Sequence, residues 1–487
     1  MLDILGARDP NETLIYTSQS TVSSTRFVQA VREAIQWLKA QRVRQLGLLL
    51  DNEPAWLVWD LAAQELDVCL VPLPTFFSSE QTSHIVSTTG LTHIVYSDAY
   101  TSLLAGCEAV NEYALTGDLV AHCKVRQYKP TNAPLLPANT HKITFTSGST
   151  GTPKGVCLSS EHCLLVAESI ADRVKQDRPK HLCTLPLSTL LENLAGIYQT
   201  WIQEGTVVLL PLAELGFDGG RLTSFTSFIE AINQTQPQSM ITVPALLMAL
   251  IQAGQAGMPL PKSFRFVAVG GARVAPSLVE QAAALGLPVY EGYGLSEAAS
   301  VVSINTPTQN RAGTSGKVLD HVRVREEKGE LLVDGPLFLG YMNQPETWGK
   351  TSYHTGDLGS ISEDGFVQVS GRKSNLLITT LGRNIAPEWL EGELFASGLF
   401  SQCVILGNDL PYCAALLVAP EVVTNQQISL CLHDLNARVP EYARIERWLR
   451  LDTPLTVGQG FWTENGRPKR QAIAQAFTEQ LGPNEDF

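Results

Sequence analysis

The sequence lacks the features that mark several large classes of protein. Its nine cysteines are scattered without a C-x-x-C pair, so the sequence predicts neither a disulfide framework nor a zinc site. Acidic residues outnumber basic ones, giving a formal net charge of −13. This charge argues against nucleic acid as a partner, because domains that bind it are usually basic. The most apolar N-terminal segment, 46–74, is interrupted by acidic residues, so we expect no membrane span.

We also expect no targeting signal at either end of this sequence. No basic segment precedes an apolar core at the N-terminus, and the C-terminal NEDF matches no familiar anchor or address. We therefore expect a cytoplasmic protein. With 44% hydrophobic and 17% charged residues, the composition is typical of a packed globular enzyme. A length of 487 residues predicts two or three domains.

The pattern of apolar segments predicts an α/β fold. Up to about residue 290, short apolar runs such as KITFTS and FRFVAV alternate with helix-length patterns such as RFVQAVREAIQWLKA. This alternation favours parallel sheets covered by helices on both faces. VRVREEKGELLVDGP then predicts an antiparallel hairpin with a Lys-Gly turn, and the chain beyond about residue 373 predicts a small α+β domain.

The strongest chemical signal is the segment TSGSTGTPKG, residues 146–155. It follows an apolar strand and combines three glycines, five hydroxyl side chains and one lysine. Such a loop can wrap backbone N–H groups around a phosphate, with Lys154 adding positive charge. A flexible linker is the alternative, but linkers rarely lie between two buried strands. The spacing differs from the Walker motif, so a P-loop NTPase is not indicated.

The loop closely resembles the signature of the AMP-forming, adenylate-forming enzymes, which include acyl- and aryl-CoA synthetases, luciferases and adenylation domains. Further segments resemble that family in the right order: YEGYGLSE (290–297), DGPLFLGYMNQPETW (334–348), SYHTGDLG (352–359) and GRKSN (371–375). The resemblance covers nearly the whole chain and is closest to acyl-CoA synthetases. It implies a large N-terminal domain of layered parallel sheets with a β-rich subdomain, residues 1–371, and a small mobile C-terminal domain, residues 372–487.

The resemblance also implies the roles of individual residues around ATP. Glu297 would be a ligand of Mg²⁺, with Ser296 near the α-phosphate. Tyr293 would lie beside adenine, and Asp357 would accept hydrogen bonds from the ribose hydroxyls. The nucleotide-binding set is Thr146, Ser147, Gly148, Ser149, Thr150, Gly151, Lys154, Gly270, Gly271, Ala272, Glu291, Gly292, Tyr293, Gly294, Asp357 and Arg372.

The segment LPLSTLLENLAG, 185–196, indicates the chemical class of the carboxylic acid substrate. It lacks the Asp with which amino-acid-activating relatives hold an ammonium group, so an amino acid is not favoured. It resembles the L-P-L-[SA]-H segment of acyl-CoA synthetases, with Thr189 where His is common. The apolar residues of this segment and of VPALLMAL would line the pocket for the acyl group, or alternatively pack in the core. We expect an uncharged apolar acid, fatty or aryl, with fatty preferred.

The C-terminal segment ENGRPKRQAI, 464–473, resembles a family element whose lysine approaches the α-phosphate and the carboxylate. Arg467 occupies the lysine column, and Lys469 lies two residues further on. We prefer Lys469 as the catalytic cation, with Arg467 as the alternative; a solvated basic surface is the third interpretation. A guanidinium is not interchangeable with an ammonium. The hinge after Arg372, usually Asp or Lys in the family, is Ser374 here.

The resemblance implies a two-step ligase reaction. A carboxylate and ATP give acyl-AMP and pyrophosphate, and a thiol then takes the acyl group and releases AMP. Coenzyme A is the expected acceptor, with Gly382 either lining its path or serving as a turn glycine. A carrier-protein phosphopantetheine is the alternative acceptor, and a non-catalytic nucleotide-binding relative is the alternative function. A luciferase-like oxygenase is a more remote possibility.

Overall fold

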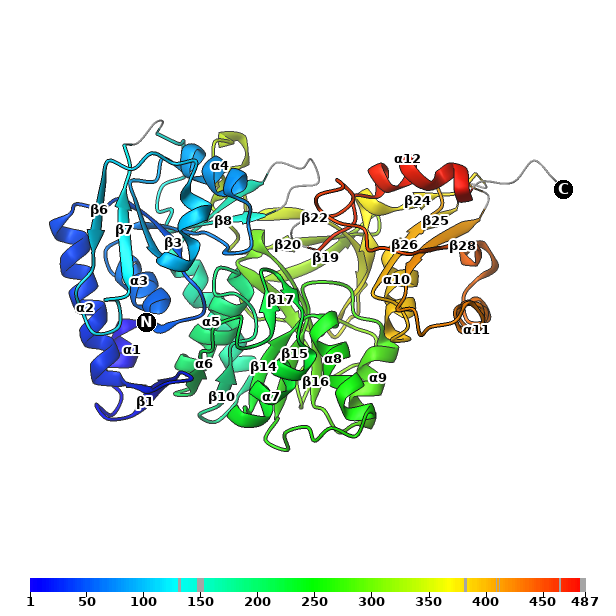
Figure 1. The fold of residues 1–487 in the computed structure, drawn as a ribbon, viewed down its shortest axis with the longest axis horizontal. Helices are drawn as coiled ribbons and strands as arrows, with labels where there is room; N and C mark the ends of the chain where they lie inside the picture. Colours follow the sequence, from blue (N-terminus) through cyan, green and yellow to red (C-terminus); the bar gives the residue numbers. More distant parts are fainter. Residues whose placement is uncertain are drawn as a thin grey trace.

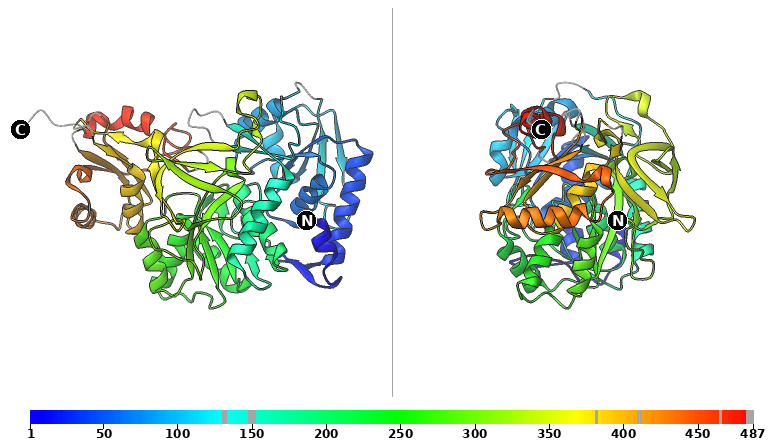
Figure 2. Two further views of the ribbon diagram at one scale, coloured as in Figure 1. Left: turned by 180° about the vertical axis from the view of Figure 1, so that it is seen from behind. Right: turned by 90° about the vertical axis from the view of Figure 1, so that its right-hand side faces the viewer.

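The computed structural model describes residues 1–129, 133–146, 153–380, 383–408, 410, 412–463 and 466–481. Two sheets with parallel centres and helices packed around them form most of the molecule, and the C-terminal elements α10 to α12 lie at the opposite end from α1 and α2 (Figure 1). The end-on view in Figure 2 places the C-terminal helices in front of the sheets of the larger part.

The first sheet has nine strands in the order β18-β17-β16-β15-β14-β10-β11-β1-β2. Its central pairs, from β1 through β16, are parallel, whereas β2, β17 and β18 add antiparallel edges. The strands are β1 (Thr13–Tyr16), β2 (Thr21–Ser23), β10 (Lys180–Leu182), β11 (Thr206–Val208), β14 (Ser239–Thr242), β15 (Phe266–Val269), β16 (Val289–Leu295), β17 (Ser300–Ile304) and β18 (Lys317–Val318).

The second sheet has eight strands in the order β21-β9-β8-β4-β3-β5-β7-β6. The pairs β3–β4, β3–β5 and β4–β8 are parallel, and the outer pairs are antiparallel. The strands are β3 (Gln45–Leu49), β4 (Cys69–Pro72), β5 (His93–Ser97), β6 (Asn111–Ala114), β7 (Cys123–Gln127), β8 (Lys142–Thr146), β9 (Lys154–Leu158) and β21 (Gly340–Tyr341).

The helices that cover these sheets begin and end with ordinary helix signals. In α2, Ser23 caps the N-terminus, and Phe27, Val31 and Leu38 are buried along one face. Pro54, Pro244 and Pro276 occupy first-turn positions, where proline costs no hydrogen bond. The helices are α1 (Leu2–Gly6), α2 (Ser24–Ala40), α3 (Pro54–Gln64), α4 (Ser79–Thr89), α5 (Ser160–Val174), α6 (Gln199–Ile202), α7 (Phe225–Thr235), α8 (Pro244–Gln255) and α9 (Pro276–Ala284).

A buried ion pair joins the second sheet to the helices around it. The Lys142 ammonium of β8 lies 2.9 Å from the Asp60 carboxylate of α3, and both side chains are at most 2% exposed. Asn193 and Tyr198 donate hydrogen bonds to the same carboxylate. Both come from η2 (Glu192–Tyr198), a π-helix. The buried charges are thus paired and hydrogen-bonded, as burial requires.

The predicted Lys-Gly hairpin is confirmed in a four-stranded antiparallel sheet, β19-β20-β22-β23. Its strands are β19 (Arg323–Glu327), β20 (Glu330–Asp334), β22 (Ser352–Ile361) and β23 (Val367–Arg372). Lys328 and Gly329 both have positive φ, the conformation of the tight turns that match strand twist. The sheet carries Asp357 on β22 opposite Arg372 on β23.

The C-terminal part is a small α+β unit with its own apolar core. Its strands β26 (Gln402–Leu406), β27 (Cys413–Val418) and β28 (Ile445–Leu451) pack against helices α10 (Pro387–Ala396), α11 (Asn425–Asn436) and α12 (Arg470–Leu481). A two-stranded ribbon, β24 (Leu377–Ile378) with β25 (Asn384–Ile385), precedes α10. The boundary predicted between residues 371 and 372 stays a prediction; it falls at the end of β23.

The predicted fold class is confirmed: parallel sheets layered with helices, a β-rich sheet and a separate α+β unit at the C-terminus. Within the described residues, no helix is both long and apolar enough to cross a membrane.

Candidate active site

The carboxyl end of β16 supplies the first residues of the candidate site. The strand carries Glu291 and Tyr293 and leads directly into η3 (Ser296–Ala298), which contains Glu297. A register shift between Tyr293 and Gly294 interrupts the pairing of β16 with β17. The strand then ends at Leu295, and Ser296 and Glu297 follow directly on η3.

Glycine is required where the neighbouring strands approach each other. A Cβ at Gly294 would lie 1.6 Å from the backbone oxygen of Ser300, and one at Gly270 would lie 2.9 Å from the carbonyl oxygen of Gly292. Neither position can carry a side chain unless the backbone moves. These contacts bring the predicted GGA segment, 270–272, next to β16.

Asp357 is held by residues from two different strands. The Tyr293 hydroxyl donates a hydrogen bond to Asp357 Oδ2 at 2.7 Å, and Arg372 Nη1 lies 3.0 Å from Asp357 Oδ1. Burial raises the pKa of the Asp357 carboxyl, and the charge of Arg372 and the hydrogen bond from Tyr293 oppose that rise. The structure therefore gathers three predicted nucleotide-binding residues around one carboxyl group.

Glu297 lies against two tyrosines that carried no predicted role. Tyr341 donates a 2.6 Å hydrogen bond to Glu297 Oε1, and the hydroxyl of Tyr353 lies 3.4 Å from the same oxygen. The two tyrosine hydroxyls are 2.9 Å apart. Burial, with the Glu297 charge, raises the pKa of Tyr353 to about 12, so the hydroxyl stays protonated near neutral pH.

The phosphate-binding loop is described only at its two ends. Ser147, Gly148, Ser149, Thr150 and Gly151 lie outside the described residues. Thr146 and Lys154 pair across the β8–β9 ladder at the base of the loop. The Lys154 ammonium lies 5.3 Å from the centre of the Tyr341 ring, a cation–π contact. Through Tyr341, this lysine and Glu297 belong to one cluster.

Glu291 occupies an unusual environment for a carboxylate. Ser315 donates a 2.6 Å hydrogen bond to its Oε1. Burial raises the pKa of Glu291 to about 7, while this hydrogen bond and the charge of Arg273 act in the opposite direction. Arg273 donates hydrogen bonds to the backbone oxygens of Val369 and Ser370 on β23. Glu291 therefore changes charge close to neutral pH.

The three basic residues of the C-terminal segment have different environments. Arg470 makes a bidentate ion pair with Glu391, at 2.5 and 2.6 Å, and both side chains are 14% exposed. Lys469 has an exposed side chain, and its backbone N–H donates a hydrogen bond to the carbonyl oxygen of Phe461. Arg470 thus has a structural partner within the C-terminal unit.

Arg467 is the member of this group whose charge interacts with the predicted nucleotide site. Its side chain is exposed, as is that of Lys469, and its guanidinium interacts electrostatically with Arg372, Asp357 and Glu297. Burial among protein atoms and the repulsion of Arg372 lower its pKa, whereas the two carboxylates raise it. The same interaction helps oppose the raised pKa of Asp357. The C-terminal unit therefore places a cation close enough to influence the charges of Asp357 and Glu297.

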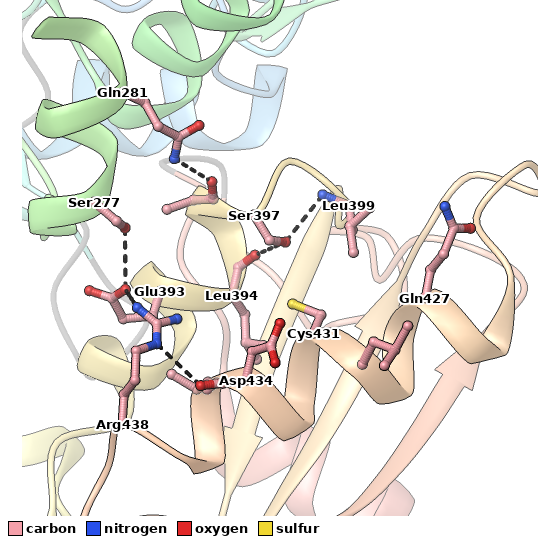
Figure 3. A pocket seen from close by; sticks show the side chains of 13 residues that line it. Ser277, Gln281, Glu393, Leu394, Ser397, Leu399, Gln427, Cys431, Asp434 and Arg438 are labelled. Carbon is pink, nitrogen blue, oxygen red and sulfur yellow. Dashed lines mark hydrogen bonds and ion pairs between the residues drawn. The ribbon is translucent and has the colours of Figure 1, made fainter. Parts of the chain in front are cut away.

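Helix α9 of the large part meets α10 of the C-terminal unit beside a pocket of about 450 Å³ (Figure 3). Ser277 donates a 3.2 Å hydrogen bond to Glu393, and Gln281 donates to the carbonyl oxygen of Ala396 at 2.9 Å. Arg438 lies 3.6 Å from the Glu393 carboxylate. These bonds join the two parts in the orientation that places Arg467 near Asp357.

The predicted hinge residue Ser374 lies in η5 (Lys373–Asn375), immediately after β23. Its hydroxyl donates to the neighbouring Asn375 side chain at 3.3 Å. Gly382, the other residue with a predicted role near the thiol path, lies outside the described residues. Ser374 thus stands between the β-rich sheet and the C-terminal unit.

The segment 185–196, predicted to line the acyl pocket, contains buried polar residues as well as apolar ones. Glu192 and His181 form a 2.8 Å contact with both side chains at most 2% exposed. A Cβ at Gly196 would lie 2.3 Å from the Glu192 carboxylate, so glycine is needed one turn along the π-helix. The leucines of VPALLMAL, on α8, belong to an apolar core cluster, which favours the core-packing alternative for that segment.

No role was predicted from the sequence for Tyr341, Tyr353 or Arg273. All three contact or electrostatically influence predicted site residues. Tyr341 lies within the segment 334–348 that resembles the family, which was the available signal. Nothing in that segment indicated which carboxylate its hydroxyl would meet.

Comparison with family models matches residues 5–342 to AMP-binding enzyme and residues 374–482 to AMP-binding enzyme C-terminal domain. A 243-residue segment, 44% of the chain, is 30% identical to the long-chain-fatty-acid–CoA ligase FadD15 of Mycobacterium bovis and spans only 40% of that ligase. A feruloyl-CoA synthase of Amycolatopsis is 25% identical over 423 residues, 82% of this chain and 83% of that protein.

Solved structures resemble the fold over almost the whole chain. The anthranilate CoA ligase AuaEII in complex with anthranoyl-AMP superimposes with a TM-score of 0.82 at 17% identity, covering 98% of this chain and 96% of that one. The o-succinylbenzoate CoA synthetase of Bacillus subtilis, in complex with its acyl-adenylate, gives a TM-score of 0.76 at 21% identity, covering 97% of both chains.

Proposed function

The chain belongs to the AMP-binding enzyme family, and we propose that it activates an apolar carboxylic acid with ATP and transfers the acyl group to a thiol. In the first half-reaction, a carboxylate oxygen bonds to the α-phosphorus of ATP and pyrophosphate leaves. In the second, the thiol sulfur bonds to the acyl carbon, the thiol proton is lost and AMP leaves. Coenzyme A is the proposed acceptor.

One observation carries the proposal: four charged groups from three separate segments meet in one cluster. Glu297 follows β16, Asp357 and Arg372 face each other on β22 and β23, and Arg467 comes from the C-terminal unit. The charges of Arg372, Arg467 and Glu297 act on the pKa of Asp357, and those of Arg372, Asp357 and Glu297 act on the pKa of Arg467. Cations and carboxylates gathered this way suit a reaction that must bring two anions together.

Asp357 and Arg372 would hold the ribose. An ionised carboxylate accepts from two neighbouring hydroxyls, and the hydrogen bond from Tyr293 fixes its orientation. Tyr293 would lie beside the adenine with the GGA segment at 270–272. Thr146, Lys154 and the loop between them would bind the phosphates.

Glu297 would hold Mg²⁺, because carboxylate oxygen is a donor that this hard cation prefers. The fit is supported by the hydrogen bonds from Tyr341 and Tyr353, which both address Oε1 and orient the carboxylate. Bound Mg²⁺ would supply neutralisation of phosphate charge. Ser296 precedes Glu297 on η3 and would donate near the α-phosphate.

Arg467 would be the cation that approaches the reacting carboxylate and α-phosphate in this orientation of the C-terminal unit. The electrostatic influence of Asp357 and Glu297 on its guanidinium supports this assignment over Lys469; the side chains of both residues are exposed, so exposure does not separate them. A guanidinium can donate two parallel hydrogen bonds to one phosphate or carboxylate, which an ammonium cannot do. Lys469 is the proposed alternative cation if the segment slides by two residues.

The acid would be uncharged apart from its carboxylate, and fatty or aryl. Support comes from the segment 185–196, whose buried Glu192 is matched by His181 and so leaves no free carboxylate for a substrate ammonium. The relatives named above act on long-chain fatty, feruloyl and anthranilate groups. A fatty acid is the preferred substrate class, and the cytoplasm the proposed location.

Pyrophosphate release across a panel of carboxylic acids, each with and without coenzyme A, tests the proposal. Release that depends on one acid class, with a thioester product when coenzyme A is present, is the expected result. Acid-dependent release without a thioester would favour a carrier-protein phosphopantetheine as acceptor. No release with any acid would contradict catalysis and favour a nucleotide-binding relative.

A further inference from the structure

Three residues outside the proposed active site bring a carboxylate, an imidazole and a thiol together. Glu53 directly precedes α3, whereas His122 and Cys123 stand at the start of β7. His122 Nε2 lies 2.8 Å from Glu53 Oε2 and 3.5 Å from Cys123 Sγ. All three potential ligand atoms lie within 4.8 Å of one another. The fold thus brings three kinds of metal-binding side chain together from two distant parts of the sequence.

Only one of the two oxygens of the Glu53 carboxylate has a hydrogen-bond partner among the described residues. Oε2 contacts His122, but Oε1 is buried without a hydrogen-bond partner among the described residues. A buried, unpaired oxygen of a charged group is costly. A cation held between Glu53, His122 and Cys123 would remove that cost. The ion pair of Glu53 with His122 does not remove it, because it leaves Oε1 unpaired.

The spacing suits a small tetrahedral ion. Zinc binds nitrogen and oxygen at about 2.0 Å and sulfur at about 2.3 Å, which places tetrahedral ligands about 3.3 to 3.6 Å apart. The 3.5 Å contact between His122 and Cys123 already has this spacing, and the 2.8 Å contact between His122 and Glu53 must lengthen slightly to meet it. The donor set of sulfur, imidazole nitrogen and carboxylate oxygen suits zinc better than magnesium or calcium, which prefer oxygen alone.

Zinc binding requires a neutral imidazole at His122 and a thiolate at Cys123. The cation would therefore displace a proton from each residue that holds one when it binds.

The cluster can be reached from solvent on one side. The His122 side chain is 51% exposed and that of Glu53 is 22% exposed, whereas Cys123 is 1% exposed. A cation can therefore enter past the imidazole and bind the thiol at the base. With three protein ligands, the fourth position would be open to water.

We propose that Glu53, His122 and Cys123 form a zinc-binding site that is independent of the nucleotide site. The site uses no pair of cysteines, so the C-x-x-C spacing that usually indicates zinc is absent from the sequence. Zinc there would join the N-terminus of α3 to the start of β7, bridging two elements at one end of the second sheet.

Cobalt(II) titration of the full chain, without ATP or magnesium, tests the proposal directly. Cobalt bound through the Cys123 thiolate gives a sulfur-to-cobalt charge-transfer absorption, which saturates at one equivalent and is reversed by one equivalent of zinc. Cys123→Ser abolishes this absorption, and His122→Ala weakens zinc binding at least about tenfold by chelator competition. Cys431→Ser and His433→Ala, both on α11, are matched controls with wild-type behaviour.

The outcomes separate metal binding from a merely structural cluster. Zinc raises the melting temperature of the wild type and of the two controls, but not of His122→Ala. The proposal is overturned if the wild-type chain shows no charge-transfer band, a result that needs no variant to fold. It is equally overturned if wild type and His122→Ala bind zinc with the same affinity.

Discussion

The hydroxyl of Tyr293 donates a 2.7 Å hydrogen bond to the carboxylate of Asp357, joining β16 of the nine-stranded sheet to β22 of the β-rich sheet. The Arg372 guanidinium holds the other carboxylate oxygen at 3.0 Å. The proposed ribose site is therefore an assembly of three strands, and its geometry depends on each of them.

Tyr293→Phe is expected to weaken ATP use. A hydrogen bond to a charged group contributes about 1.5–3 kcal/mol, so the KM for ATP should rise about 10- to 100-fold while the KM for the acid changes little. Initial rates at varied ATP measure the effect. Tyr290→Phe, three residues earlier on the same strand and stacked on Phe266, is the control. Equal KM values for the two variants would contradict the role of the Tyr293–Asp357 bond.

Arg467→Ala is expected to lower acyl-AMP formation at least about hundredfold, because a positive charge near the reacting groups is lost. Lys469→Ala should stay within about twofold of wild type, since the C-terminal cation whose charge acts on Asp357 is Arg467. Arg467→Lys should recover only part of the rate. Single-turnover formation of acyl-AMP measures all three. The reverse order, with Lys469→Ala the slower variant, would assign the catalytic cation to Lys469.

Glu291 is expected to make stability depend on pH. Its folded-state pKa of about 7 lies above the ordinary value of 4.5, so its stabilising protonation is fully present below pH 4.5. That contribution is lost as the pH rises through about 7, and amounts to at most about 3 kcal/mol. Glu291→Gln should therefore gain stability relative to wild type between pH 5 and pH 8. Thermal unfolding at both pH values measures the difference; a constant gap would rule out titration of Glu291.

Glu393→Ala is expected to slow the first half-reaction more than the second. The change removes the bonds to Ser277 and Arg438, and so weakens the orientation that holds Arg467 near Asp357. Acyl-AMP formation should fall about 3- to 10-fold, corresponding to about 1 kcal/mol. Thioester formation from supplied acyl-AMP should change less. Glu421→Ala, at an exposed carboxylate of the C-terminal unit, is the control. Equal slowing of both steps would contradict an orienting role.

The layered α/β fold could be predicted because buried parallel strands are apolar throughout and alternate with helices. Polar motifs at strand ends, such as Tyr293 on β16 and Glu297 just after it, could also be located in advance. What the sequence could not show was the partner of each polar group. The contact of Tyr341 with Glu297 spans 44 residues, and the pair of Lys142 with Asp60 joins a strand to a distant helix.

The choice among the three C-terminal cations also depends on tertiary contacts. The bidentate pair of Arg470 with Glu391 fixes the start of α12, and an isolated bridge between Trp462 and Pro468 fixes the preceding segment. In this arrangement the charge of Arg467 acts on Asp357, while the side chains of both Arg467 and Lys469 are exposed. Sequence spacing places both residues on one extended face, and from the sequence alone we prefer Lys469.

The most direct test of acid activation is ATP–pyrophosphate exchange by the wild-type chain, without coenzyme A, because exchange reports only the reversible first half-reaction. The account predicts exchange that requires Mg²⁺ and an apolar carboxylic acid, and that is lost in both Glu297→Ala and Arg467→Ala. Exchange that proceeds equally well without any acid, or that survives both substitutions unchanged, would contradict it.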